Sequence, residues 1–118
     1  QNIEHYGTAS DGQLAKLYNS SIAFVYPSLY EGFGIPLLEA MSCSAVVIAA
    51  NTSSFPEVVG EAGILFDPQS IDHLTDSLLF ILDNPSERER LIQEGLDRAQ
   101  CFSWDRTASQ TVELYKSL

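Results

Sequence analysis

The sequence has few basic residues, and it has no long apolar segment. Six Lys and Arg residues stand against sixteen Asp and Glu residues in 118, which gives a formal net charge of −10. A chain of this charge repels nucleic acid and anionic membrane surfaces, so we expect no nucleic-acid partner. No apolar run approaches the roughly 18–20 residues that a membrane span needs, and the first residues show no signal-peptide pattern.

Cysteine is also scarce. Cys43 and Cys101 show neither the spacing of a metal site nor that of a disulfide framework. We therefore expect two reduced thiols in a cytoplasmic protein, with no metal site. The length of the chain predicts one domain, residues 1–118, because a chain of this size buries roughly two-thirds of its unfolded surface.

Apolar runs and helical patterns alternate along the first part of the chain. Residues 22–26 and 45–50 are unbroken apolar runs, which are typical of strands buried on both faces of a parallel sheet. The sequence predicts a Rossmann-like α/β fold with flanking helices, followed by helices alone from about residue 70. The strands are expected at residues 2–7, 22–26, 45–50 and 63–66, and the earlier helices at 11–19, 36–43 and 56–59.

The βα turn at residues 27–36 lies at the carboxyl end of a predicted strand, where ligands bind in parallel sheets. Pro36 suits the first position of a helix, because its missing N–H would be unpaired there in any case. Gly32 and Gly34 permit positive φ or a close approach of a ligand to the backbone. The turn is therefore predicted to present free peptide N–H groups to phosphate or another anion.

Two carboxylates accompany this turn. Glu31 lies in the loop and Glu39 about one turn into the helix. A carboxylate beside an anion site is suited to accept hydrogen bonds from a vicinal diol rather than to bind the anion. A ligand that carries both phosphate and hydroxyl groups fits the two features, and a sugar nucleotide is such a ligand.

These residues resemble a known family. The string PSLYEGFGIPLLEAM at residues 27–41, with SFPEV at 54–58 and DP at 67–68, resembles the C-terminal domain of the family-4 glycosyltransferases, which have the GT-B architecture. The segment G-x-x-S-D-x-x-L-A-x-L-Y at residues 7–18 and FSW at 102–104 extend the resemblance over nearly the whole chain.

The resemblance implies a retaining transfer of a hexosyl unit from a nucleoside-diphosphate sugar to a glycan, a lipid or another acceptor. Glu31 would be catalytic and contact hydroxyls of the donor sugar, and Glu39 would hold the ribose diol. The family's reaction needs no metal and no cofactor besides the donor. The donor-binding set would be Gly32, Phe33, Gly34, Ile35, Leu38 and Glu39.

The chain departs from the family in two places. Ser44 stands where relatives have a glycine that ends the helix, so we expect less comfortable local geometry. The arginine and lysine that bind the diphosphate in relatives are absent. We therefore expect the chain to be the later part of a GT-B C-terminal domain, with little transferase activity without the acceptor-binding N-terminal domain. Any peripheral membrane association would come through missing parts.

The basic residues and several polar residues have simpler expected roles. The basic side chains are all expected on helix faces away from the βα turn: Lys16, Arg88, Arg90, Arg98, Arg106 and Lys116. Thr52 and Ser54 are interpreted as helix caps first and nucleotide contacts second. Phe102 and Trp104 are expected in the core or docked between helices.

Three other functions fit parts of the pattern. A nucleotide-sugar epimerase has a related fold, and a non-catalytic module could keep the pocket without the cations. An acidic receiver-type signalling domain has a similar size and charge. That last class needs a lysine late in the sheet, and none occurs between Lys16 and Lys116.

Overall fold

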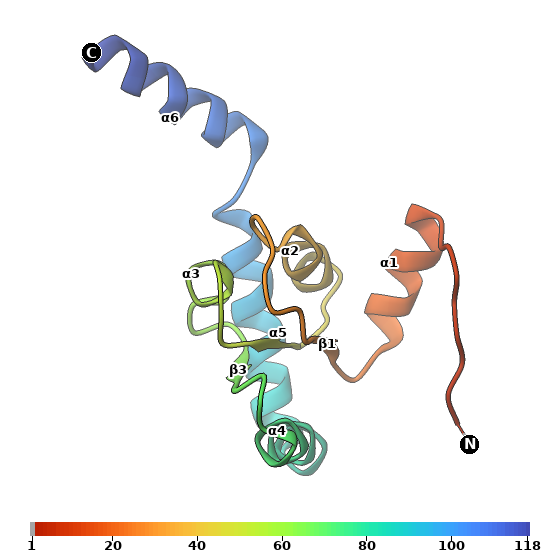
Figure 1. The fold of residues 1–118 in the computed structure, drawn as a ribbon. Coiled ribbons are helices and arrows are strands. Elements are labelled where there is room, and N and C mark those ends of the chain that lie inside the picture. Colours follow the sequence, from red (N-terminus) through yellow and green to blue (C-terminus); the bar gives the residue numbers. More distant parts are fainter. Residues whose placement is uncertain (1) are drawn as a thin grey trace.

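The computed structural model describes residues 2–118. A three-stranded sheet is surrounded by helices, with a long helix projecting from the body (Figure 1). The elements in chain order are α1 (Asp11–Ser20), β1 (Phe24–Tyr26), α2 (Ile35–Ser42), β2 (Val47–Ala50), α3 (Phe55–Val59), β3 (Ile64–Phe66), α4 (Ile71–Asp83), α5 (Pro85–Gln100) and α6 (Trp104–Ser117).

The sheet is parallel throughout, as the apolar runs predict. Its order is β1-β2-β3, so Ile48 of β2 lies between Val25 of β1 and Ile64 of β3. All four residues of β2 are buried, whereas β1 is an edge strand of three half-buried residues. The prediction of burial on both faces is therefore right for β2 and wrong for β1, because β1 has only one neighbouring strand.

The strand predicted at residues 2–7 is absent. Only Ile3 and Tyr6 in that segment are large and apolar, and their side chains are 81% and 60% exposed. The segment runs outside α1, away from the sheet (Figure 1). With so little apolar surface to bury, it gains nothing from joining the edge of the sheet.

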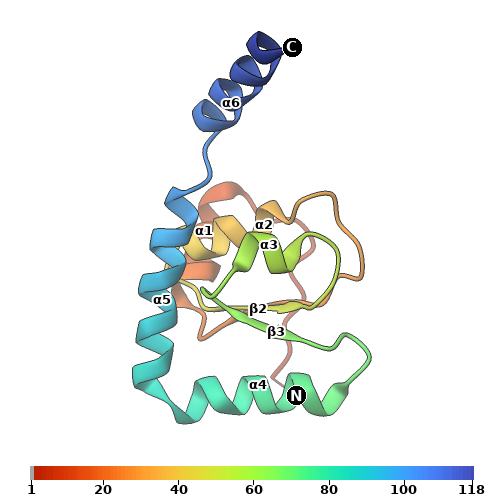
Figure 2. The same cartoon turned by 90° about the vertical axis from the view of Figure 1, so that its left-hand side faces the viewer.

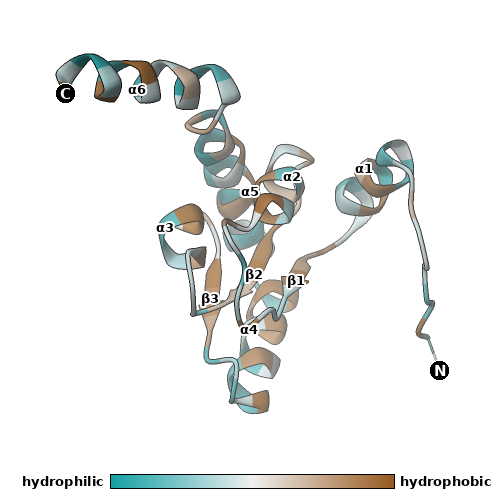
Figure 3. Cartoon of the chain, turned by 45° about the horizontal axis from the view of Figure 1, so that its top comes forward, coloured by the Kyte–Doolittle hydropathy of each residue, from teal (hydrophilic) through white to brown (hydrophobic). Residues whose placement is uncertain are grey.

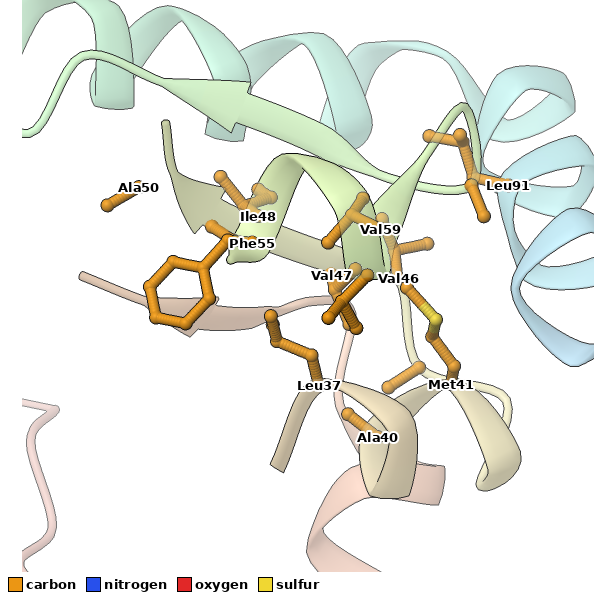
Figure 4. Packing of buried hydrophobic residues seen from close by; sticks show 14 of the residues in the cluster. Leu37, Ala40, Met41, Val46, Val47, Ile48, Ala50, Phe55, Val59 and Leu91 are labelled. Atoms are coloured by element: carbon orange, nitrogen blue, oxygen red, sulfur yellow. The ribbon is translucent and has the colours of Figure 1, made fainter. Parts of the chain in front are cut away.

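Helices cover both faces of the sheet. Figure 2 shows α2 and α3 on one side of β2 and β3, α4 on the other side, and α5 closing one end. Leu37 and Met41 of α2 point into the core beside Ile48, Phe55 and Val59 (Figure 4). Helix α5 packs against α2 at the buried Gly95, where a Cβ would lie 3.4 Å from Met41 Cγ, in ordinary contact.

Serine residues cap the starts of three helices. Ser10 and Gln13 form a complete capping box at α1. The hydroxyls of Ser70 and Ser103 accept hydrogen bonds from the third N–H of α4 and α6. Asn84 precedes Pro85 at the α4–α5 break, where proline occupies the start of α5.

Helix α6 has no buried residue and projects from the body of the molecule (Figures 1 and 2). Its projection accounts for the elongated shape of the chain, 56 × 30 × 28 Å. Apolar and polar residues alternate around it (Figure 3), and Trp104 is 81% exposed. The expectation that Trp104 lies in the core is therefore wrong: its side chain lines an open cavity with Phe33 and Phe102 at the start of a helix that has no buried residue. No helix in residues 2–118 has the length and apolar character to cross a membrane.

The C-terminus of α2 has the geometry expected where relatives have glycine. Ser44 adopts a positive φ of 64°. Its N–H donates to Met41 O at 3.1 Å, and the Ala45 N–H donates to Ala40 O at 3.0 Å. These two bonds form a Schellman motif, in which the residue with positive φ is usually glycine. The strain therefore falls on a residue with a Cβ.

Replacing Ser44 with glycine is expected to stabilise the fold. Removing the Cβ relieves the left-handed conformation, and after the entropy of glycine in the unfolded chain is deducted, about 0.5–1 kcal/mol remains. The measurement is the free energy of unfolding in urea. The matched control is Ser44→Ala, which keeps a Cβ and should give no gain; an equal gain from both substitutions would rule out backbone strain at this residue.

Candidate functional site

Two loops meet at the carboxyl edge of the sheet. The glycine loop (residues 27–34) follows β1 and leads into α2, and the hydroxyl loop (residues 51–54) follows β2 and leads into α3. Because β1 and β2 are parallel neighbours, their carboxyl ends bring both loops to the same edge. Ligands of parallel α/β sheets bind at this edge.

Three hydroxyl groups join the two loops. Thr52 donates a hydrogen bond to Leu29 O at 3.1 Å. Ser53 donates to Glu31 O at 2.8 Å, and Ser54 donates to Phe33 O at 2.9 Å. Ser54 is the N-cap residue of α3, but neither its side chain nor that of Thr52 makes a capping bond, so the interpretation of both hydroxyls as caps is wrong. The hydroxyl loop holds the main chain of the glycine loop at every second residue.

The two glycines of the loop differ in what the fold requires. Gly34 has a φ of 91° and is the N-cap residue of α2. A Cβ there would lie 3.0 Å from Phe55 Cε1 and 3.2 Å from Leu37 Cδ1. Gly32 has a negative φ and no heavy atom within 4 Å of the Cβ position. The fold therefore requires glycine at residue 34 and not at residue 32.

The start of α2 is open to a ligand. No side chain caps this helix, and Pro36 has no N–H. The Leu37 N–H donates to Gly34 O at 3.0 Å. The N–H of Ile35 precedes the first helical hydrogen bond, as do those of the glycine loop before it. A helix start of this kind attracts anions through its free N–H groups and its dipole.

Glu31 is held on the β1 side of the loop. Its side chain is half-buried and accepts a hydrogen bond from the Ser28 hydroxyl at 3.1 Å. Burial raises the pKa of Tyr26, and the adjacent Glu31 carboxylate raises this pKa further. The carboxylate thus lies beside two hydroxyl-bearing side chains at the end of β1.

Glu39 lies on a different side of α2, facing α1. It lines a cavity of about 450 Å³ together with Leu38, Asp11 and Tyr18. Burial raises the pKa of Tyr18, and the nearby Glu39 and Cys43 raise this pKa further. Glu31 does not line this cavity, so the two carboxylates flank the start of α2 rather than meeting each other.

A second, more apolar cavity of about 330 Å³ lies in front of the loop. Phe33, Ile35 and Leu38 line it, and Phe102 and Trp104 form the opposite wall. Leu38 and Phe102 line both cavities. The structure therefore brings Phe33, Ile35, Leu38 and Glu39 around adjoining cavities, while Glu31 and Gly32 line neither.

Arg98 was expected on a helix face away from the βα turn, but it contacts this turn through Phe102. It is half-buried, with its guanidinium 5.0 Å from the centroid of the Phe102 ring, and that ring lies 5.7 Å from the ring of Phe33 in the glycine loop. The spacing of four residues between Arg98 and Phe102, at the end of a helix, is the signal that the sequence contained. Arg90, by contrast, pairs with Glu87 and Glu94 on an exposed face, as expected.

Among residues 2–118, no group of three or more His, Cys, Asp and Glu side chains is arranged to hold a metal ion. The site is instead built from peptide N–H groups, two carboxylates and apolar walls. A glycine loop at a helix start, on the carboxyl edge of a parallel sheet, defines a Rossmann-like α/β domain.

Comparison with known proteins places this domain in a family. The chain belongs to the glycosyl transferases group 1, whose sequence profile matches residues 1–98. It has the fold of a GT-B Rossmann-like domain: it superposes on sucrose-phosphate synthase from Thermosynechococcus elongatus with a TM-score of 0.78 at 34% identity, over 88% of this chain and 27% of that one.

Two curated relatives are mannosyltransferases. The chain is 45% identical to the O-antigen chain mannosyltransferase B of Escherichia coli over 98% of its own length and 30% of the relative. It is 42% identical to the MMP alpha-(1->4)-mannosyltransferase of Mycolicibacterium hassiacum, over 91% of its own length and 27% of the relative. The chain thus spans less than a third of these relatives.

Alanine substitutions at Gly32 and Gly34 are expected to have different effects on the free energy of unfolding. Gly34→Ala should lower the free energy of unfolding by about 2 kcal/mol, because the new Cβ meets Phe55 and residue 34 cannot relax its positive φ. Gly32→Ala should change it by less than about 0.5 kcal/mol. Urea unfolding of both variants measures the difference, and equal losses would show that the loop does not distinguish them.

Proposed function

We propose that this chain is the donor-binding part of a retaining glycosyltransferase that transfers a hexosyl unit from a nucleoside-diphosphate sugar to a glycan, lipid or other acceptor. The observation that carries the proposal is the open start of α2, preceded by a glycine loop that three hydroxyls hold and flanked by Glu31 and Glu39. Family membership supports it. The mannosyltransferase relatives make a mannosyl donor the first to test.

Each part of the donor has a proposed partner. The diphosphate faces the peptide N–H groups of Gly32, Phe33, Gly34 and Ile35, and Leu38 supports the donor from the apolar wall. Glu31 is the proposed catalytic residue and accepts hydrogen bonds from the donor sugar, while Glu39 accepts those of the ribose diol. The position of Glu39 at a cavity between α1 and α2 supports a nucleoside there, apart from the sugar beside Glu31.

The proposed transfer uses no metal and no cofactor besides the donor. The helix start stabilises the leaving diphosphate, and electrostatic stabilisation of the leaving group is the main catalytic contribution. The remaining cations and the acceptor site would come from the rest of the enzyme, as would any contact with a membrane. We place the reaction in cytoplasmic glycan biosynthesis, a compartment that fits the two free thiols of Cys43 and Cys101.

A non-catalytic sugar-nucleotide module is the second candidate. One observation favours it: the guanidinium of Arg98, which contacts the loop through Phe102, donates to main-chain carbonyls instead. Such a module would bind the donor with the same residues and lack transfer activity in any longer context.

Calorimetric titration of the chain with GDP, UDP and ADP, and with GDP-mannose first among the sugars, tests donor binding. Glu39→Ala is expected to weaken the preferred nucleotide about tenfold or more, because a carboxylate that accepts the diol contributes about 1.5–3 kcal/mol. The matched control is Glu89→Ala on the exposed face of α5, which should bind as the parent does. Absence of binding at millimolar nucleotide would overturn the half-site for this chain on its own, and unchanged binding by Glu39→Ala would overturn the ribose role.

A further inference from the structure

Phe33 is held from two directions, although it lies between two glycines. Its carbonyl accepts a hydrogen bond from the Ser54 hydroxyl at 2.9 Å. Its ring packs edge-on against Phe102, with 5.7 Å between centroids and 73° between planes. Gly32 makes no packing contact of its own, so these two contacts of Phe33 contribute to how the peptide groups between Gly32 and Gly34 point.

Phe102 is itself fixed by Arg98. The guanidinium lies 5.0 Å from the centroid of the Phe102 ring. Its Nε donates to Val58 O at 3.0 Å, and its Nη2 donates to Glu57 O. These carbonyls belong to the last turn of α3, where helix carbonyls lack partners and a positive charge is favoured. The planar guanidinium can serve both carbonyls while it packs on a ring.

The contacts close a circuit through α3. Ser54 at the start of this five-residue helix holds the main chain of Phe33, and the carbonyls at its end hold Arg98. Arg98 holds Phe102, and Phe102 holds the ring of Phe33. The main chain of Phe33 is therefore held by the start of α3, and its side chain is held through Phe102 and Arg98 by the end of α3.

We propose that Arg98 and Phe102 are positioning residues that fix Phe33 and, through it, aim the peptide N–H groups of the glycine loop at the donor diphosphate. The last clause rests on the proposed function; the fixing of the loop does not. Neither residue touches the donor in this arrangement. The charge of Arg98 acts on α3 and on an aromatic ring, which explains how a basic residue near the loop serves it without binding phosphate.

Nuclear magnetic relaxation of the ligand-free chain tests the fixing directly. The order parameters of the Gly32, Phe33 and Gly34 amides should fall from the rigid range near 0.85 towards 0.6 or below in Phe102→Leu and in Arg98→Met. Phe102→Tyr keeps the ring and should keep the parent values. Arg88→Met, which removes a charge from the same helix without these contacts, is the control for Arg98. Unfolding in urea confirms that each variant is folded.

Binding of GDP, UDP or ADP then tests the consequence for the donor. Phe102→Leu and Arg98→Met should weaken the nucleotide about threefold to tenfold relative to parent and controls, the range expected for loss of one aromatic contact. Unchanged order parameters in both variants would overturn the positioning role, whatever the nucleotide does. If the order parameters fall in the variants but the parent chain binds no nucleotide, the result would support the fixing of the loop. It would then overturn only the proposal that the loop binds the donor.

Discussion

The central strand β2 is the constraint on which the rest of the structure depends. Its four residues are completely buried and pair with parallel neighbours on both sides. Its pairing aligns Ile48 with Val25 of β1 and Ile64 of β3, while α2, α3 and α4 cover its two faces. The register in turn brings the glycine loop and the hydroxyl loop to one edge. The site is thus a consequence of how the core is packed.

Elements whose sequence signals are local could be predicted, and contacts between distant segments could not. The unbroken apolar runs at residues 22–26 and 45–50 identify β1 and β2, because this signal acts within a few residues. The strand predicted at residues 2–7 failed because pairing at a sheet edge depends on a partner elsewhere. The prediction that Trp104 is buried was wrong for a related reason. Amphipathic spacing predicts that one face of a helix is buried, but it does not identify the segment that covers this face.

The candidate site shows the same division. The turn after β1 and the helix that follows it could be predicted, because glycines before Pro36 indicate a βα turn that leads into a helix start. That the fold requires glycine at residue 34 but not at residue 32 could not be predicted, since this depends on Phe55, twenty-one residues after Gly34. Ser54 has a strong local preference for capping, yet its hydroxyl binds the carbonyl of Phe33. A preference of about 1 kcal/mol is readily exchanged for a hydrogen bond of similar strength.

Charge sets the final limit on what the site can do. A nucleoside diphosphate brings negative charge to a chain that already carries −10, beside Glu31 and Glu39. A helix start contributes about 0.3–1 kcal/mol near water, which is small against that repulsion. Arg98 cannot help directly, because its donors serve the carbonyls of α3 and its face serves Phe102. If the donor binds here during transfer, the neutralising cations must therefore be contributed by another part of the enzyme. The orientation of the peptide N–H groups then matters more than their number. The contacts that hold Phe33 are this chain's own means of controlling that orientation.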